Sequence, residues 1–455
     1  MIVRYVLLLP ILLLCLTASD PHFGYKHITK DPQTSQVREL PWMSLTTFDK
    51  YLRDHDNRVA DEFFVSDYFY PTVNFWFLIY TQFTSQHVVI HDKNNLSLIY
   101  KVLDFSHLKA QGLSANSVYI LQNKITQEKI SEIRRHLLIL EKSPFSLGAE
   151  AKLIHRILAD NKIKTPINKA QRKLFFQKLR ENIRTQTGQR NFIKDGIVRS
   201  LPYKTFINKF FKKMNLPPEL LAIPFLESSF NPKAESKVGA LGVWQFMPLI
   251  SSYYVPKRSK RPEFDYRSNV GVISIAAAYL MKENFQLMKS WDLAVTAYNS
   301  GTKHLIQTKR ELSGKYPKIN LEHIIRHSDS NHFGFASKNF YGEFLALVHA
   351  LAYEEELFDE LHQHDRYNVE EDLKFHLTKC SLRLDKVLTA KQLDDVFFHN
   401  HHLSSHDLLY PKSTIITSKE NLPHEKFLPI KLDQMISLKP KEWEKLLLRQ
   451  SCSTR

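Results

Sequence analysis

Glycine is scarce in this sequence, with 12 glycines among 455 residues. Neither a GxGxxG run nor a GxxxxGK run followed by Ser or Thr occurs. Nucleotide-driven enzymes take backbone donors for phosphate from such loops, so we do not expect one here. With 43% hydrophobic and 24% charged residues, the composition excludes a disordered or polytopic membrane protein. A chain this long is expected to form at least two folded units.

Long apolar runs are also few, and the first one opens the chain as MIVRYVLLLPILLLCLTASD. Arg4 precedes an apolar run that is too short to span a bilayer comfortably. This pattern predicts a secretory signal peptide over residues 1–19 and a mature chain that starts near Asp20. Cys15 follows two leucines, whereas lipoprotein signals prefer small residues there. Simple cleavage is therefore favoured, and an uncleaved membrane tether is the alternative.

Cysteine is rare, and cleavage of the leader would leave Cys380 and Cys452 in a compartment that permits disulfides. Their spacing leaves open whether the two pair. Acidic residues are outnumbered, 47 against 63 lysines and arginines, which gives a net charge of +16. Such a charge predicts attraction to an anionic polymer or surface. For an exported, periplasmic chain we expect peptidoglycan stems or anionic lipid, with membrane association an option, and no nucleic acid. The oligomeric state is not indicated.

The N-terminal part combines one predicted hairpin with several predicted helices. Two β-branched runs flank Asp92-Lys93-Asn94-Asn95, which predicts a hairpin near residues 87–104. Farther along, apolar residues recur at helical spacing up to Pro144, which predicts a helix ending before that proline. The same reasoning predicts helices over 149–158, 170–187 and 203–214.

In the run LLAIPFLESSFNPKAESKVGALGVWQFMP, one acidic residue, Glu227, lies among apolar residues. Prolines 217 and 218 open a predicted helix and Asn231-Pro232 ends it, which places Glu227 in its last turn. Pro224 is expected to distort this helix. The neighbours of Glu227 are apolar, and no cation stands beside it. Burial and the negative end of the helix dipole both raise the pKa of a carboxyl group, which suits a proton donor.

Two further helices are predicted downstream, over 268–288 and 290–299. Ser290 is a plausible N-cap of the second, and Gly301 stops it. This helix reads SWDLAVTAYNSG, and its apolar residues can face a core. Tyr298 and Asn299 then stand at the helix end, where their polar groups can face a cleft.

Three ordered motifs carry a family resemblance. The runs ESSFNPKAESKVGALGVWQFMP, TAYNSG and FGFASKNFYGEFLAL resemble the family-1 lytic transglycosylases, especially the membrane-bound D-type branch. The similarity is strongest from about Thr185 to Ala352, and weaker through NFWFLIYTQF and VVIHDKNNLSLIYKV. It implies a mainly α fold of the lysozyme-like α+β superfamily. We expect a mostly helical region over 20–200, a catalytic domain over 201–360 and a small C-terminal unit over 361–455.

The resemblance also implies site residues. Glu227 matches the sole catalytic acid/base, Ser236 and Gln245 match positions that contact the sugar, and Tyr298 and Asn299 match the Ala-Tyr-Asn motif of the cleft. It implies no metal and no organic cofactor. On local pattern alone, Ser236 could equally cap a helix, Gln245 could be a buried amide and Tyr298 a core residue.

The chain departs from the family pattern at two places. Asp265 and Arg267 are present, but the Asp-Pro that follows in many relatives is absent. Phe340 stands where many members have tyrosine, with Tyr341 next to it, which puts a late cleft hydroxyl in doubt.

The implied activity is cleavage of the MurNAc-GlcNAc β-1,4 bond with formation of 1,6-anhydroMurNAc. Most glycosidases use two carboxylates, whereas this family needs one because the 6-hydroxyl of the sugar attacks its own anomeric carbon. The alternatives are a muramidase that admits water, using the same Glu227, and a glycan-binding protein without activity. The glycan-binding protein is the rival from another class, and a basic nucleic-acid binder is a third.

Two other clusters have simpler interpretations. The run FFHNHHLSSH contains four histidines but no recognisable metal-ligand spacing, so we interpret it as a solvated loop. The basic run from Lys257 to Arg261 reads as an exposed loop beside the cleft that could hold acidic peptide stems.

Overall fold

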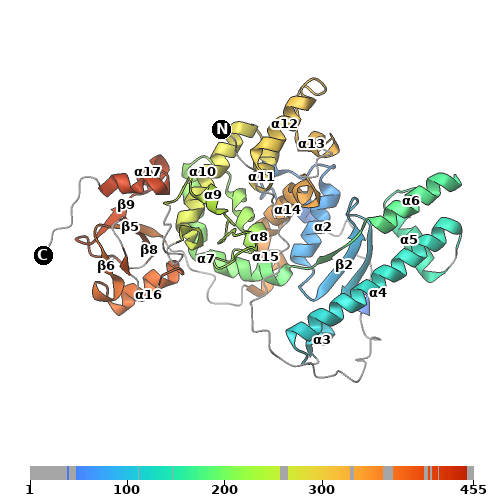
Figure 1. Cartoon of the computed structure of the whole chain (residues 1–455), viewed down its shortest axis with the longest axis horizontal. Coiled ribbons are helices and arrows are strands. Elements are labelled where there is room, and N and C mark those ends of the chain that lie inside the picture. Colours follow the sequence, from blue (N-terminus) through green and yellow to red (C-terminus); the bar gives the residue numbers. More distant parts are fainter. Residues whose placement is uncertain are drawn as a thin grey trace. The chain divides into compact units, whose positions relative to one another are not determined.

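The computed structural model describes residues 38–39, 48–110, 112–146, 148–256, 265–327, 333–361, 372–403, 408–409, 412–418 and 420–447. The predicted signal peptide, the basic run Lys257–Arg261, His406 and Cys452 lie outside these ranges. The chain forms two compact units (Figure 1). One combines Val59–Phe63 with the chain from Ile193 onward, and the other combines Phe64–Phe192 with the described residues before Val59.

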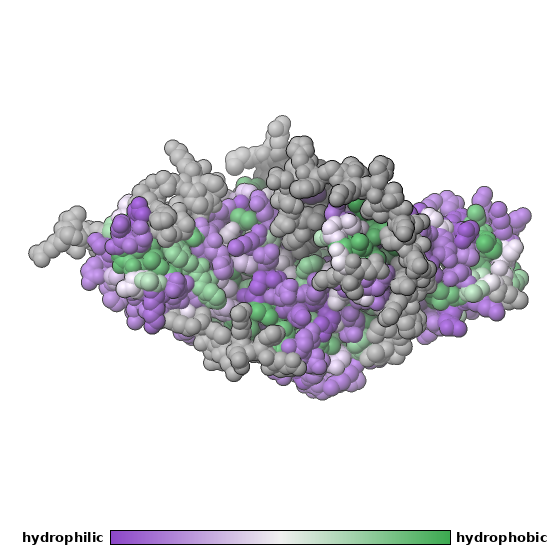
Figure 2. Space-filling model, turned by 90° about the horizontal axis from the view of Figure 1, so that it is seen from below, coloured by the Kyte–Doolittle hydropathy of each residue, from purple (hydrophilic) through white to green (hydrophobic). Residues whose placement is uncertain are grey.

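Among the described residues, none of the helices has the length and hydrophobicity required to cross a membrane. The face shown in Figure 2 has hydrophobic residues interspersed among hydrophilic ones.

The N-terminal unit contains a four-stranded antiparallel sheet in the order β1-β3-β2-β4. The strands are β1 (Arg38–Glu39), β2 (His87–Asp92), β3 (Ile99–Asp104) and β4 (Ile183–Thr187). β2 and β3 form the predicted hairpin, and Val89 pairs with Val102. The Asp92 carboxylate accepts from the backbone N–H groups of Asn94 and Asn95, at 2.7 and 2.9 Å, and so shapes the start of the connection.

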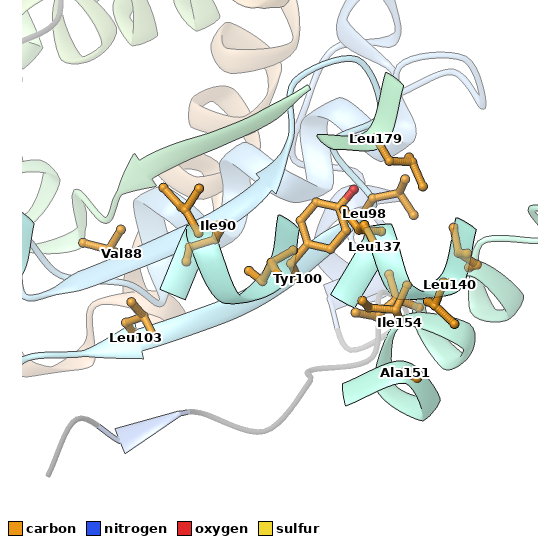
Figure 3. Packing of buried hydrophobic residues seen from close by; sticks show 14 of the residues in the cluster. Val88, Ile90, Leu98, Tyr100, Leu103, Leu137, Leu140, Ala151, Ile154 and Leu179 are labelled. Atoms are coloured by element: carbon orange, nitrogen blue, oxygen red, sulfur yellow. The ribbon is translucent and has the colours of Figure 1, made fainter. Parts of the chain in front are cut away.

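Helices of this unit pack on the sheet. They are α2 (Tyr70–Thr81), α4 (Ala115–Lys142), α5 (Ala149–Asp160) and α6 (Lys169–Glu181), with the short α1 (Asp49–Leu52) and α3 (Ser106–Ala110). Apolar residues of α4, α5 and α6 pack against β2, β3 and the residue before β3, for example Leu137 and Ile154 near Leu98 and Tyr100 (Figure 3). The predicted helices over residues 149–158 and before Pro144 are therefore confirmed.

One predicted helix is wrong in its last third. Residues 170–187 were expected to be a single helix, but α6 ends at Glu181 and residues 183–187 form β4. This strand pairs with β2 over five residue pairs, from Val88–Thr187 to Asp92–Ile183. The backbone N–H and C=O groups of residues 183–187 find partners on the free edge of β2, and this pairing favours a strand over a longer helix.

The second unit is mainly helical, as predicted. Its helices before the C-terminal segment are α7 (Arg190–Lys213), α8 (Ala222–Ser228), α9 (Pro248–Ser251), α10 (Val270–Met288), α11 (Trp291–Ser300), α12 (Thr302–Leu312), α13 (Leu321–His327), α14 (Phe335–Ala352) and α15 (Glu354–Leu357). α10 and α14 are buried on most of their surfaces. α11 packs against both, and α8 packs against α14, so the short helix that carries Glu227 rests on the most buried part of the unit.

The C-terminal segment belongs to the same compact unit. A three-stranded sheet, β8-β5-β9, uses Lys374–Thr378 (β5), Thr414–Thr417 (β8) and Phe427–Ile430 (β9). β6 (Leu382–Arg383) pairs with β7 (Leu408–Leu409), and α16 (Ala390–His399) and α17 (Leu432–Ser437) complete the segment.

This segment packs directly on α10. A Cβ on Gly271 would lie 2.6 Å from Ile416 Cδ1 and 2.9 Å from Phe375 Cζ, so a larger residue here would require these side chains to shift. Two residues before Gly271, the Asn269 side-chain amide donates to Asn400 Oδ1 at 3.0 Å. The small C-terminal unit thus shares a packed, hydrogen-bonded boundary with the helix that follows the loop around the site.

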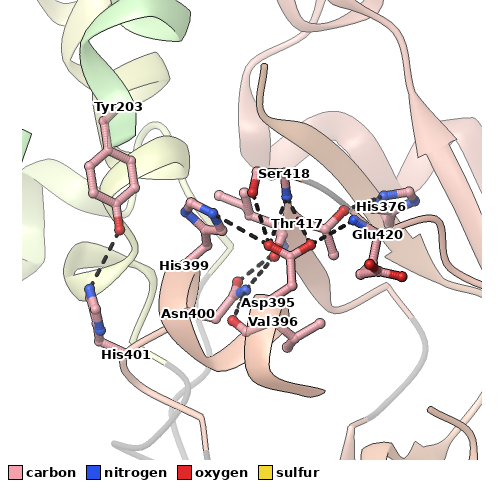
Figure 4. Close-up of polar contacts among 11 residues, drawn as sticks. Tyr203, His376, Asp395, Val396, His399, Asn400, His401, Thr417, Ser418 and Glu420 are labelled. Atoms are coloured by element: carbon pink, nitrogen blue, oxygen red, sulfur yellow. Dashed lines mark hydrogen bonds and ion pairs between the residues drawn. The ribbon is translucent and has the colours of Figure 1, made fainter. Parts of the chain in front are cut away.

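The histidine cluster differs from the solvated loop that we expected. His399 is buried, and its Nε2 lies 3.6 Å from the Asp395 carboxylate (Figure 4). The hydroxyl of Tyr203 lies 3.5 Å from Nε2 of His401. Within the described ranges, no group of three or more potential ligands could hold a metal ion. These histidines therefore join the C-terminal segment to α7.

Candidate active site

Glu227 stands next to the last residue of a seven-residue helix, α8. We expected one distorted helix, and the chain instead forms a 3-10 turn, Pro218–Leu221, followed by α8. Pro224 is the third residue of α8, a position whose N–H has no partner within a helix, so the proline is accommodated. Ser229 and Phe230, with φ of 50° and 56°, end the helix in left-handed geometry. This stop places Glu227 in the last turn, as predicted.

The Glu227 side chain is buried, with 9% of the residue exposed. Burial raises its pKa to about 8, and the negative charge of Glu343 adds to the rise. Among the described residues, no donor makes a hydrogen bond to this carboxyl group. A carboxyl in this setting carries its proton at neutral pH, which is the state that a general acid requires.

Glu343 is the residue near the site that sequence reasoning missed. It is half-buried in α14, and it is the only acidic residue of that 18-residue helix. The available signal was the same one that identified Glu227, an acid surrounded by apolar residues. A second carboxylate close enough to affect the first is therefore a feature of the site.

Residues 234–246, here called the 234–246 loop, are tied to the end of α8 through Ser228. The Ser228 hydroxyl lies 2.9 Å from the Val243 carbonyl oxygen and 3.1 Å from the Pro224 carbonyl oxygen. It also accepts from the N–H of Asn231 at 3.1 Å. Because Ser228 follows Glu227 directly, these bonds fix the loop relative to the acid.

Gln245 and Ser236 both bond within the 234–246 loop. The side-chain amide of Gln245 donates to the carbonyl oxygens of Ala234 and Gly242, at 3.0 and 2.9 Å. Its Oε1 has no hydrogen bond to any described residue, so an acceptor remains available for a ligand. The Ser236 hydroxyl accepts from the N–H of Ala240 at 2.9 Å. Ser236 therefore closes the far turn of the loop.

Arg267 holds the loop from the other side. Its guanidinium pairs with both oxygens of Asp265, the shortest contact being 2.6 Å, and donates to the carbonyls of Gly239 and Phe246 at 2.6 and 3.0 Å. Gly242 has φ of 78°, and a Cβ there would lie 1.9 Å from the Arg267 carbonyl oxygen. The family residues that this chain retains thus have a clear structural use, in spite of the missing Asp-Pro.

Tyr298, at the end of α11, lies between the loop and the acid. Its hydroxyl donates to the Trp244 carbonyl oxygen at 2.6 Å, and its ring contacts those of Trp244 and Phe246. Burial raises the pKa of Tyr298, and the charge of Glu227 raises it further, so the two side chains are close. Because the Tyr298 hydroxyl donates its proton to the Trp244 carbonyl oxygen, it does not donate to Glu227.

Asn299 and the late motif connect α11 to α14. The Ser337 hydroxyl donates to Asn299 Oδ1 at 3.1 Å. Phe340 is buried. Tyr341 is also buried, and its pKa is raised by burial and by the charge of Asp292. Tyr341 thus lies near Asp292. Its hydroxyl does not bond to Glu227, so it does not take the place of the tyrosine hydroxyl that many family members have at the position of Phe340.

The structure therefore groups Glu227, Tyr298 and the 234–246 loop with Gln245, while Asn299 faces α14 and Ser236 lies at the loop's far turn. Ser290 occupies the N-cap position of α11 as predicted, without a capping hydrogen bond from its side chain. The arrangement supplies one neutral acid, one free amide oxygen and one nearby carboxylate.

Comparison with known proteins identifies relatives of part of this chain. Residues 204–320 match the model of the transglycosylase SLT domain. Membrane-bound lytic murein transglycosylase D of Escherichia coli (strain K12) is 34% identical over 125 residues, 27% of each chain. A putative tributyltin chloride resistance protein of Alteromonas sp. (strain M-1) is 32% identical over 118 residues, 26% of this chain and 56% of the relative. The matched part spans about a quarter of the Escherichia coli relative.

The SLT-domain match covers α8, the 234–246 loop and α11, the elements that surround Glu227. The matches agree with the resemblance read from the motifs and with a lysozyme-like, mainly α fold. Residues 204–320 of the chain therefore form a transglycosylase SLT domain.

Proposed function

We propose that this protein is a peptidoglycan lytic transglycosylase that cleaves the MurNAc-GlcNAc β-1,4 bond and leaves 1,6-anhydroMurNAc, with Glu227 as its acid/base. The observation that carries the proposal is a buried carboxyl with a pKa of about 8 at the end of α8, inside the matched domain. The name of the Escherichia coli relative, a murein transglycosylase, supplies the substrate class.

The chemistry balances with a single residue. Protonated Glu227 gives its proton to the glycosidic oxygen as the bond between that oxygen and the anomeric carbon breaks. The ionised carboxylate then takes the proton of the 6-hydroxyl while O6 bonds to the same carbon. No water is consumed, and the carboxyl returns to its starting state. The ring closure is intramolecular, so proximity replaces an ordered water.

The neighbouring residues would support these steps. The free Gln245 Oε1 suits the N–H of an N-acetyl group, because the amide's own donors are occupied within the loop. Tyr298 would offer a ring face to the sugar and position the loop. Asn299 and Ser236 would line and shape the site from α11 and from the loop turn.

Digestion of purified sacculi tests the proposal. Mass spectrometry should detect muropeptides lighter by one water than their reducing-end counterparts. Glu227→Gln should abolish their release, because an amide cannot give up the proton. Glu235→Gln, which changes an exposed acid of the 234–246 loop, is the matched control and should retain activity. Full release by Glu227→Gln would remove Glu227 from the mechanism.

Glu343 favours one rival, a muramidase. A second carboxylate near the first is what a hydrolase needs to activate water. Digestion in water enriched in oxygen-18 separates the two reactions. Hydrolysis would label the new reducing ends, and Glu343→Gln would stop it. Unlabelled anhydro products support the transglycosylase. An inactive glycan-binding protein would release neither product.

We also propose that the protein works in the cell envelope after export and removal of residues 1–19. The Cys380 side chain is engaged in a disulfide bond, which fits an oxidising compartment. The relative's name places that protein at a membrane. Peptide sequencing of the mature N-terminus from the periplasmic fraction would test both statements; an intact leader would contradict cleavage.

A further inference from the structure

The N-terminal unit presents two large apolar side chains almost completely to solvent. Phe145, in the connection between α4 and α5, is 90% exposed, and Ile167, just before α6, is 96% exposed. Ile139 and Leu174 nearby are 40% and 53% exposed. We call these four residues the helical tip. Figure 2 shows hydrophobic residues among hydrophilic ones at the right-hand end, where Figure 1 places α4, α5 and α6.

The helical tip is held in place by one arginine. Arg172 donates from Nε to the Glu141 carbonyl oxygen at 3.1 Å and from Nη1 to the Ile167 carbonyl oxygen at 2.8 Å. These bonds join the last turn of α4 to the segment that leads into α6. Asn168 caps α6 by accepting from the backbone N–H groups of Ala170 and Gln171. Ile167 therefore protrudes from a fixed backbone.

The surroundings of the helical tip are strongly basic. Between Lys142 and Lys173 the chain has eight lysines and arginines against two acidic residues. The exposed lysines include Lys142, Lys164, Lys169 and Lys173. On the acidic side, the Glu141 carboxylate is already paired with Arg180 at 2.7 Å. The positive charge around the apolar residues is thus largely uncompensated.

We propose that the helical tip binds the surface of an anionic lipid bilayer, with Phe145 and Ile167 entering the interface and the lysines contacting lipid headgroups. Apolar insertion combined with a basic patch is the pair of signals that gives stable peripheral binding. Peptidoglycan stems would attract the lysines but offer no apolar phase for the two side chains. Phe145 and Ile167 are each almost completely exposed, so they do not form a packed patch like the one at the core of a protein interface.

Vesicle co-sedimentation with the purified mature chain tests this proposal. Binding to vesicles of phosphatidylglycerol and phosphatidylcholine should exceed binding to phosphatidylcholine alone by roughly tenfold or more, and should weaken with added salt. The double variant Phe145→Ser with Ile167→Ser should lose about tenfold or more of the binding. Leu287→Ser is the matched control, because Leu287 is a 57% exposed apolar residue of α10, and it should bind like the wild type.

Two further measurements keep the result interpretable. Circular dichroism and muropeptide release should be unchanged in the double variant, so that lost binding cannot reflect unfolding. Equal binding of the wild type to vesicles with and without phosphatidylglycerol would overturn the proposal. A double variant that binds anionic vesicles as well as the wild type does would also overturn it. Retention by sacculi without any retention by anionic vesicles would also overturn it, in favour of a cell-wall contact.

Discussion

Replacing Glu227 by glutamine should stabilise the folded protein, by an amount that grows with pH. The carboxyl keeps its proton up to a pKa of about 8 when folded, against 4.5 for a free side chain. Between these two values the folded state binds the proton that the unfolded state has released. The free energy of unfolding therefore falls as pH rises through this window. Glutamine is neutral at every pH and escapes this loss.

The size of the effect follows from the pKa difference. One pKa unit corresponds to about 1.36 kcal/mol, so the full rise is equivalent to about 5 kcal/mol. With a single titrating group, the advantage of the glutamine variant should be about 1 kcal/mol at pH 5, about 3 at pH 7 and about 4 at pH 8. The trend of about 1 kcal/mol per pH unit is the quantity to test.

Urea denaturation of the wild type and of Glu227→Gln at pH 5, 6, 7 and 8 gives this trend directly. The transition of the unit that contains Glu227 is fitted separately, because chains with two units need not unfold in one step. Glu235→Gln, which changes an exposed acid of the 234–246 loop, should show no comparable pH-dependent gain. A gap between Glu227→Gln and wild type that stays constant from pH 5 to 8 would refute the reasoning, since it would mean that Glu227 is ionised when buried.

Three further results are expected. Glu343→Gln removes a negative charge that raises the Glu227 pKa, so the alkaline limb of the activity profile should move to lower pH, and an unmoved limb would contradict the coupling. Gly242→Ala places a Cβ 1.9 Å from the Arg267 carbonyl oxygen at a φ of 78°, so the melting midpoint should drop by about 5 °C or more; a wild-type midpoint would show that the loop can adjust. Trp443→Ala should cost about 3–5 kcal/mol and expose the C-terminal segment to limited proteolysis, and unchanged protection would argue against tight docking.

Features with local causes could be predicted from the sequence. The turn at Asp92 comes from a side chain that bonds to the backbone two and three residues ahead. The end of α8 is set within a few residues of Asn231-Pro232, which placed Glu227 in the last turn. Gly301, at φ of 75°, stops α11 as expected. Each of these signals acts over a few residues and needs no knowledge of the rest of the chain.

Features that depend on distant partners could not be predicted. β4 is a strand because it pairs with β2, which lies some ninety residues earlier in the chain. α2 is rich in aromatic residues yet helical, since nine of its twelve residues are buried among partners that the local sequence does not reveal. The influence of Glu343 on Glu227 likewise depends on the packing of α14 against α8. Proximity of this kind requires the fold.

The bonds around Glu227 explain how the site can be rigid while its acid stays neutral. Ser228, Gln245, Arg267 and Tyr298 each donate to backbone carbonyls of the 234–246 loop or of α8. Within the described part of the chain, none of these four side chains donates to Glu227. A donor aimed at the carboxylate would stabilise its anion and lower its pKa. Because these polar side chains bond to the backbone instead, burial is the largest influence on the Glu227 pKa. The loop is thus held in place without lowering that pKa. Substitutions at these four residues should therefore change the placement of the loop, and with it kcat or KM, more than they shift the pH at which activity is lost.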